Sequence, residues 1–225
     1  MSLKKGLQMY KFQSLKDHVY DYIAEQISQG NLLPDEKINE NKICQELNIS
    51  RTPVREALIQ LSSENVLENV PRKGFVVKDL NPKEAAEIYE VVGVLDGYAA
   101  TLACGRLTAK TLKDMEFYIN SMDLAIDSGN YEMYYKQQEI FHQLYLVECG
   151  NDTLVDSLLK LKKKFVAKKY DLNCMEDVKA ILFETNNEHK EMLKLFKTNK
   201  TDELEHYIRQ VHWDPSKSAT EVTTP

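Results

Sequence analysis

The stretch "SRTPVREALIQL", Ser50–Leu61, has the features of a short helix with a cationic front. Ser50 is a residue type that caps helix N-termini, and Pro53 falls in the first turn, where its missing N–H costs no hydrogen bond. Arg51 and Arg55 lie one turn apart on one side. The apolar positions form a stripe on the other side: Val54, Ala57, Leu58 and Leu61. This helix is therefore predicted to pack by its back and to expose two arginines near its N-terminus.

Two further helices are predicted before this stretch, at 15–29 and 39–47. Gly30 and Pro34 end the first helix, and Asn39 is suited to cap the second. Only about three residues separate the second helix from the third. A tight turn in front of a helix with a cationic first turn is typical of a helix-turn-helix.

A hairpin is predicted after the third helix. Two runs rich in β-branched residues, 66–70 and 75–77, are separated by "PRKG" at 71–74. Proline and glycine favour turns, so the runs predict two strands with Arg72 and Lys73 at the tip between them. The tip of this hairpin is therefore basic, like the first turn of the third helix.

Three helices and a basic-tipped hairpin predict a winged helix-turn-helix domain at 14–78, preceded by a flexible segment at 1–13. A recognition helix reads the DNA major groove with its first turns. Arg51 and Arg55 can each pair with a guanine, and Thr52 can touch a thymine methyl or a phosphate. A three-helix domain that exposes two arginines without binding DNA would show a similar pattern.

The chain has 225 residues, of which 43% are apolar, and a formal net charge of −6. We expect a cytoplasmic protein with no membrane span, since the sequence has no long apolar run and no signal-peptide pattern. Residues 1–79 are neutral, so the whole negative excess falls in 80–225. A locally basic face on an acidic chain still binds DNA, with a strong salt dependence. The four cysteines form no C-x-x-C pair, which predicts neither a disulfide framework nor a thiolate zinc site.

The rest of the chain shows only helical periodicity. Six helices are predicted, at 82–104, 108–128, 131–149, 152–171, 175–197 and 201–213. They predict an all-α bundle over 79–213, so that the whole fold is mainly α. The polar segment 214–225 is predicted to be a disordered tail.

Three of the five histidines are placed to face the interior of the bundle: His142, His189 and His212. In the last helix the apolar face favours His212 over His206. Three inward imidazoles from three helices can bind one divalent cation such as zinc, nickel, iron or manganese. A histidine on an apolar face is more often a hydrogen-bonded core residue, so the sequence leaves both interpretations open.

The stretch "LLPDEKINENKICQELNISRTPVREALIQLSSENVLENVPRKGFVV" at 32–77 resembles the DNA-binding domain of GntR-type transcription regulators. The helical part resembles the ligand-binding domain of their FadR/VanR-like (FCD) branch, so the resemblance covers roughly residues 14–213. It implies DNA contact by these residues: Arg51, Thr52, Pro53, Arg55, Arg72, Lys73 and Gly74. Two positions depart from the family pattern. Asn41 replaces a basic residue that contacts phosphate, a role that Lys42 can take, and Asp35 replaces a turn glycine.

The resemblance also bears on the histidines. FCD-type domains are similar in having an Asp-x-x-x-His pair and two later histidines around a metal, which places His142, His189 and His212 on that pattern. Gln138 stands at the aspartate position, where a neutral amide is a poor ligand for a dication. Two alternatives follow: a three-histidine site helped by Gln138 through its amide oxygen or a water, or a metal-free effector pocket.

An effector pocket is the second implication of the resemblance, since effectors of such domains are small carboxylic acids or similar metabolites. Val92 replaces an arginine that holds an effector carboxylate in many relatives. With Val92 and Gln138 in the pocket we expect weaker complementarity to an anion, so the class of effector stays open. Tyr89, Tyr134 and Tyr145 are candidates to line the pocket, although tyrosines at helical spacing more often only pack.

These features together predict a ligand-responsive DNA-binding transcription regulator, a repressor, that binds an inverted-repeat operator as a homodimer. Two recognition helices must reach successive major grooves about 34 Å apart, which requires a partner subunit. A metal-dependent hydrolase is a competing class, but only Glu139 is placed as a general base and the winged domain would have no purpose, so we expect no enzyme. A helical protein-interaction scaffold is a further alternative.

Overall fold

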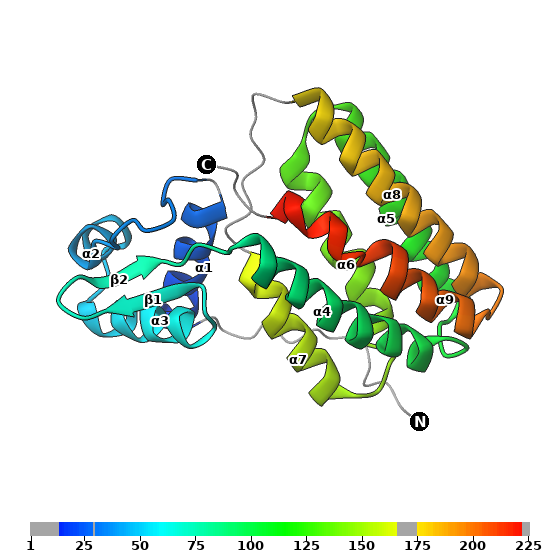
Figure 1. The fold of residues 1–225 in the computed structure, drawn as a ribbon, viewed down its shortest axis with the longest axis horizontal. Coiled ribbons are helices and arrows are strands. Elements are labelled where there is room, and N and C mark those ends of the chain that lie inside the picture. Colours follow the sequence, from blue (N-terminus) through cyan, green and yellow to red (C-terminus); the bar gives the residue numbers. More distant parts are fainter. Residues whose placement is uncertain (1–13, 29, 166–174, 222–225) are drawn as a thin grey trace. The chain divides into compact units, whose positions relative to one another are not determined.

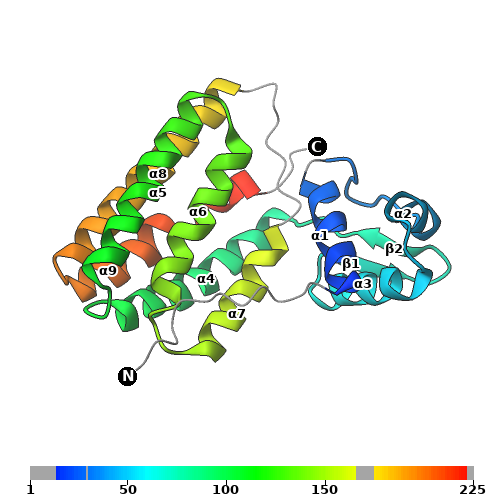
Figure 2. The ribbon, with the colours of Figure 1, turned by 180° about the vertical axis from the view of Figure 1, so that it is seen from behind.

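The computed structural model describes residues 14–28, 30–165 and 175–221, and Figures 1 and 2 show it from opposite sides. The segment 1–13, predicted to be flexible, lies outside the described residues. The described part is mainly helical with one small two-stranded sheet, as the sequence predicted. The chain divides into two compact units between Asp79 and Leu80, one residue after the predicted boundary. Among the described helices, none has the length and apolar character needed to cross a membrane.

The first unit is three helices followed by a hairpin (Figure 1). Its elements are α1 (Leu15–Ser28), α2 (Glu40–Leu47), α3 (Arg51–Ser63), β1 (Leu67–Val70) and β2 (Gly74–Val77). Asn39 caps α2 by accepting the backbone N–H of Lys42, and Asn48 ends α2 in the left-handed conformation, with φ of 52°. Ser50 occupies the N-cap position of α3 with extended backbone, although its side chain makes no capping hydrogen bond. The short turn between α2 and α3 is the one that the sequence predicted.

The buried stripe of α3 holds this unit together. The four predicted core positions of α3, Val54, Ala57, Leu58 and Leu61, are fully buried. They pack with apolar residues of α1 that are also buried: Val19, Ile23 and Ile27. β1 and β2 pair antiparallel, with Leu67 opposite Val77. The tip of this hairpin is a tight turn in which Arg72 and Gly74 have left-handed backbone, with φ of 66° and 90°.

The second unit is a helical bundle. Its helices are α4 (Pro82–Ala103), α5 (Ala109–Asp127), α6 (Tyr131–Leu146), α7 (Asp152–Lys162), α8 (Met175–Lys197) and α9 (Thr201–Tyr207). A 3₁₀ turn, η1 (Lys163–Phe165), follows α7, and a π-helical turn, η3 (Ile208–His212), continues α9. All six predicted helices are present, and the part of the fourth predicted helix at 166–171 lies outside the described residues. Figures 1 and 2 both show α5 and α8 running side by side.

α4 packs closely against α9, η3 and Trp213. Gly93 and Gly97 lie where α4 passes α9 and η3. A Cβ atom on Gly93 would lie 3.1 Å from Cβ of Trp213, and one on Gly97 would lie 3.2 Å from the carbonyl oxygen of Glu205. Glycine at these two positions therefore allows the backbones to come close, which brings the middle of α4 next to Trp213.

The C-terminal segment differs from the sequence-based prediction. The segment 214–225 was predicted to be a disordered tail, whereas the structure describes a 3₁₀ helix, η4 (Pro215–Glu221), packed against α4. Ser218 is buried, with 4% of its surface exposed, and its hydroxyl donates to the carbonyl of Pro215. The segment is held by hydrogen bonds and an ion pair of Lys217 instead of an apolar stripe, so hydrophobic periodicity does not detect it.

Candidate functional site

The first turn of α3 presents its polar side chains to solvent. Arg51, Thr52 and Arg55 are exposed, while Pro53 is half-buried in the first turn. The helix therefore has the two faces that its sequence predicted, one packed against α1 and one open to a ligand.

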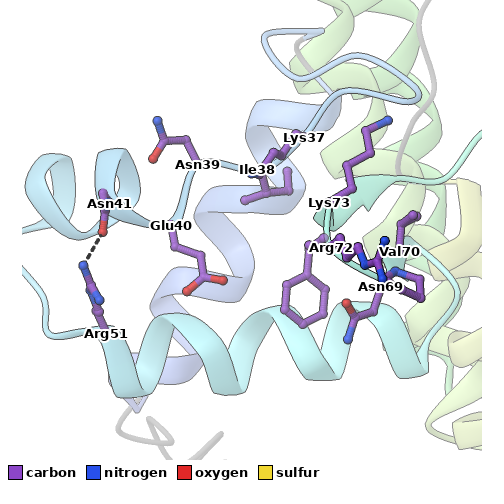
Figure 3. A pocket seen from close by; sticks show the side chains of 13 residues that line it. Lys37, Ile38, Asn39, Glu40, Asn41, Arg51, Asn69, Val70, Arg72 and Lys73 are labelled. Carbon is purple, nitrogen blue, oxygen red and sulfur yellow. Dashed lines mark hydrogen bonds between the residues drawn. The ribbon is translucent and has the colours of Figure 1, made fainter.

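A groove of about 710 Å³ runs between this first turn, the start of α2 and the hairpin tip (Figure 3). Four cations line the groove: Lys37, Arg51, Arg72 and Lys73. Glu40 is the acidic residue among its lining side chains. The predicted contacts Arg51, Arg72, Lys73 and Gly74 thus lie around one groove, and its four cations favour an anion there.

The arginines of α3 are held by neighbours at the start of α2. Nη2 of Arg51 donates to Oδ1 of Asn41 over 2.9 Å, the bond drawn in Figure 3. Nε of Arg55 lies 3.2 Å from Oε2 of Glu40. Both arginines remain largely exposed, so their remaining N–H groups are able to donate to a ligand.

Two lysines of this region differ in position from what the sequence suggested. Lys42 was expected to replace the basic residue missing at position 41, but it pairs with Glu46 on α2 over 3.8 Å and does not line the groove. Lys37 does line the groove, although no local sequence pattern selects it. Its backbone forms an isolated bridge with Val76 of the hairpin, a contact between distant segments that local patterns do not reveal.

The second candidate site is a cluster of three buried histidines in the bundle. His142 comes from α6, His189 from α8 and His212 from η3. One ring nitrogen of each lies within 4.8 Å of the corresponding nitrogens of the other two. His142 and His189 have 3% and 0% of their surface exposed. The three helices thus bring together the three imidazoles that the sequence singled out.

Two buried carboxylates flank the histidines. Asp96 on α4 accepts hydrogen bonds from the Tyr145 hydroxyl, over 2.5 Å, and from the Trp213 indole N–H, over 2.8 Å. Glu188 on α8 lies 2.8 Å from Nδ1 of His212 and also accepts from the ammonium of Lys217. Burial alone would raise the pKa of Asp96, but the charge of Lys162, 3.9 Å away, and the hydrogen bonds from His142 and Tyr145 hold this pKa well below its ordinary value. Asp96 is therefore a buried anion.

The histidines have the chemistry of metal ligands. Burial lowers the pKa of His142 to about 3, with a further contribution from Lys162, and lowers the pKa of His189 well below its usual value. Both rings are therefore neutral near pH 7, the form that binds divalent transition metals. Nε2 of His142 and Nε2 of His189 are buried without a hydrogen-bond partner among the described residues. Unsatisfied buried ring nitrogens that point into one cluster fit a divalent cation.

The other predicted pocket residues are buried in the same unit. Gln138 is half-buried on α6, one turn before His142. Val92 is fully buried, and Tyr89 packs edge-on against Phe165 and Trp213. Tyr134 is buried against Tyr135, whereas Tyr145 bonds both to Asp96 and to His142. Tyr145 therefore contacts the histidine cluster directly through its hydroxyl.

The sequence did not single out Asp96 or Glu188. Asp96 lies four residues after Val92 on the buried face of α4. A single carboxylate within an apolar stripe is therefore the sequence signal that could have identified it. Glu188 directly precedes His189, and helical spacing alone places neighbours on different faces. The role of Glu188 follows from its contact with His212 of η3, which is visible only in the tertiary structure.

Comparison with known families agrees with both units. Residues 15–77 match the bacterial regulatory proteins of the gntR family, and residues 87–212 match the FCD domain. The chain belongs to the GntR family and carries an FCD domain. The gntR family consists of bacterial regulatory proteins, which favours a regulator over the hydrolase alternative.

Individual relatives are similar at modest identity. The uncharacterized HTH-type transcriptional regulator YdhC of Bacillus subtilis is 28% identical over 63% of this chain and 63% of its own length. The gluconate operon transcriptional repressor of Bacillus licheniformis is 30% identical over 54% of this chain and 47% of its own length. The matched part thus spans less than two thirds of these relatives. The solved structure of Escherichia coli McbR/YncC covers 92% of this chain and 97% of its own, with a TM-score of 0.77 and 22% identity, which shows a shared fold.

Proposed function

We propose that this GntR-family transcription regulator binds an inverted-repeat operator as a homodimer and represses transcription. The observation that carries the proposal is the groove of four cations beside the exposed first turn of α3. The Bacillus licheniformis relative is named a repressor, which supports repression as the direction of control. Because the bacterial chromosome lies in the cytoplasm, the proposed place of action is cytoplasmic.

Base readout is assigned to Arg51 and Arg55. A guanidinium that keeps one N–H in a fixed intramolecular bond has its rotation restricted, and its other donors can form the bidentate pair with guanine. Thr52, between them, is exposed for contact with a phosphate or a thymine methyl. Lys37, Arg72 and Lys73 supply phosphate contacts that carry no sequence information but set affinity and its salt dependence.

The dimer is assigned to α4. Val91, Val94 and Tyr98 recur at helical spacing on this helix and keep 44–51% of their surfaces exposed. An exposed apolar stripe on a bundle helix is suited to pack against the same stripe of a second copy. Replacing Val94 with glutamate would place one carboxylate from each subunit in this apolar interface. We therefore expect the Val94→Glu protein to sediment as a monomer at concentrations where the unmodified protein is a dimer. Identical sedimentation of the two proteins would reject this interface.

Control by a ligand is assigned to the histidine cluster. We propose that His142, His189 and His212 hold a divalent transition metal, with zinc, nickel, iron and manganese as the candidate ions. A bound cation would supply a Lewis-acidic point to which a small metabolite with an oxygen ligand, such as a carboxylate, can bind. An effector changes operator affinity only if it prefers one arrangement of the dimer, typically with about 1–3 kcal/mol of coupling.

DNA binding tests the central proposal. The full chain is first used to select sites from a randomised duplex library, and the winning site is then titrated at two salt concentrations. We expect an inverted repeat with half-sites about one helical turn apart and a steep loss of affinity with salt. Enrichment of no common site, together with salt-insensitive binding, would reject operator recognition. Metal content of the purified protein separates the metal-dependent pocket from a metal-free one.

A further inference from the structure

We propose that Asp96, Glu188 and Asn186 are positioning residues that lock the three histidines in one tautomer. In that tautomer each ring carries its proton on Nδ1, so that all three Nε2 lone pairs face one point. The inference deepens the proposed metal site and rests on it for its purpose. The tautomers themselves follow from hydrogen bonds within the protein and are testable without a metal.

The tautomer of His142 follows from its contact with Tyr145. Nδ1 of His142 lies 2.7 Å from the Tyr145 hydroxyl, and this hydroxyl donates its proton to Asp96 over 2.5 Å. A phenol is protonated at neutral pH, so the hydroxyl has one proton to donate. Since that single proton goes to Asp96, the tyrosine oxygen can only accept from His142. Nδ1 of His142 must therefore be the donor.

The tautomer of His212 follows from Glu188. Nδ1 of His212 lies 2.8 Å from Oε2 of Glu188, and the ammonium of Lys217 donates to Oε1 of the same carboxylate. A carboxylate bound to an ammonium has no proton to give, so His212 donates from Nδ1. Lys217 belongs to η4, which makes the C-terminal segment part of this network.

The tautomer of His189 follows from Asn186 one turn earlier on α8. The amide nitrogen of Asn186 donates to the carbonyl of Ile119 over 3.0 Å and to Oδ1 of Asp123 over 2.8 Å. Both of these partners can only accept, so the amide cannot be turned around. Its oxygen therefore faces Nδ1 of His189, 3.4 Å away, and accepts from it.

The three assignments have one common consequence. Each of the three Nδ1 protons is donated to a neighbouring side chain, so each Nε2 presents a lone pair. The Nε2 atoms of His142 and His189 are buried without a hydrogen-bond partner among the described residues. Two carboxylates also stand directly behind the ligand rings, where they raise the basicity of the imidazoles and supply negative charge. This charge compensates in part for Gln138, which brings none where the family pattern has an aspartate. The site is thus arranged for a cation by residues that do not touch it.

Nitrogen NMR of the full-length, metal-free protein tests the assignment. Long-range proton–nitrogen correlation spectra distinguish Nδ1–H from Nε2–H rings, and peaks are assigned with single His→Gln variants. We expect the Nδ1–H form for His142, His189 and His212, while the exposed His18 and His206 serve as internal controls. An Nε2–H form at any of the three cluster histidines would overturn the inference.

Zinc affinity, measured by competition with a chromophoric chelator, tests whether fixing the histidine tautomers strengthens metal binding. We expect Glu188→Gln and Tyr145→Phe to weaken zinc binding about 10–100-fold. The control Glu191→Gln removes a carboxylate from an exposed pair on the same helix and should bind zinc as the unmodified protein does. Circular dichroism melts establish that each variant is folded.

The two measurements separate the inference from the metal site itself. If Glu188→Gln and Tyr145→Phe are folded and bind zinc normally, the positioning role is wrong. If the unmodified protein shows the three Nδ1–H rings but binds neither zinc nor nickel, iron or manganese, the metal site of the proposed function is wrong and the tautomer assignment stands.

Discussion

The groove of the first unit and the histidine cluster of the second use similar side chains in opposite surroundings. At the edge of the groove, the lining residue Glu40 pairs with Arg55 of α3, and two thirds of the Arg55 side chain stays exposed. In the cluster, Asp96 is fully buried and bonds to Tyr145 and Trp213. Exposed ion pairs contribute about 0–1 kcal/mol, whereas removing one partner of a buried pair costs about 3–5 kcal/mol. An exposed ion pair beside the groove can therefore open so that the arginine binds a phosphate. The buried contacts of Asp96 instead keep the side chains of the cluster in one geometry.

Removing the buried carboxylate is expected to have the largest effect. Asp96→Ala leaves Lys162 and the Trp213 N–H facing an apolar space, so we expect the free energy of unfolding to fall by about 3–5 kcal/mol. Urea unfolding followed by tryptophan fluorescence measures the change, since Trp213 is the only tryptophan. The control Asp127→Ala breaks an exposed pair with Lys179 and should cost less than about 1 kcal/mol. Equal costs for the two variants would show that burial does not distinguish these charges.

Removing an exposed arginine of α3 is expected to change DNA binding without changing stability. Arg55→Ala should weaken binding to the selected operator by about 1–3 kcal/mol and relax the preference at one base position. Lys83→Ala, which removes an exposed cation of α4, provides the charge-matched control and should retain affinity. Library selection with Arg55→Ala that returns the same preference at every position would remove Arg55 from base readout.

Acidification is expected to destabilise the second unit. The folded pKa of His142 is about 3, below the usual value near 6.5, so between these pH values the unfolded chain binds a proton that the folded chain does not. Stability therefore falls as the pH drops through this window, by up to about 1.4 kcal/mol per pH unit for each such proton. Protonation of Asp96 adds to the loss below about pH 4, because its folded pKa lies below the unfolded value.

Urea midpoints of the metal-free protein at several pH values measure this dependence. His142→Gln removes the titrating ring and should flatten the profile, whereas His206→Gln removes an exposed histidine and should leave the slope unchanged. A profile that is flat from pH 6.5 to pH 4 in the unmodified protein would contradict the neutral, buried form of these rings.

The smallest effect is expected from the acidic residue of the groove. Glu40→Gln releases Arg55 and removes a negative charge from a surface that faces phosphates, so operator affinity should rise by up to about 1 kcal/mol. Glu87→Gln removes one negative charge from an exposed pair of α4 and should leave affinity unchanged. A loss of affinity in Glu40→Gln would mean that Glu40 positions Arg55 for readout, which would make this exposed pair behave like the buried ones.

Local patterns predicted most of the fold. The buried stripe of α3, the short turn before it and the hairpin follow from periodicity and turn residues within a few positions of each other. The six bundle helices were also found, because their apolar spacing is a local signal, and the structure shows side-chain caps at the start of four of them, at Asn81, Thr108, Asn130 and Asn151. The ordered segment Pro215–Glu221 was missed, since it is held by polar contacts to other parts of the chain.

The candidate sites divide in the same way. The arginines of α3 were identifiable because the buried stripe of this helix can be recognised from its own sequence, and the arginines fall on the opposite side. Lys37 and Glu188 were not, because each acquires its role from a residue that is distant in the sequence.

The sequence by itself determined the family, the order of the helices and which three histidines turn inward, because these depend on spacing along one chain segment. The tertiary structure decided which atoms of those histidines face each other and which carboxylates stand behind them. The reason is physical: a hydrogen bond fixes a tautomer only when donor and acceptor come within hydrogen-bond distance, and here α4, α6, α8 and η3 must pack together before they do.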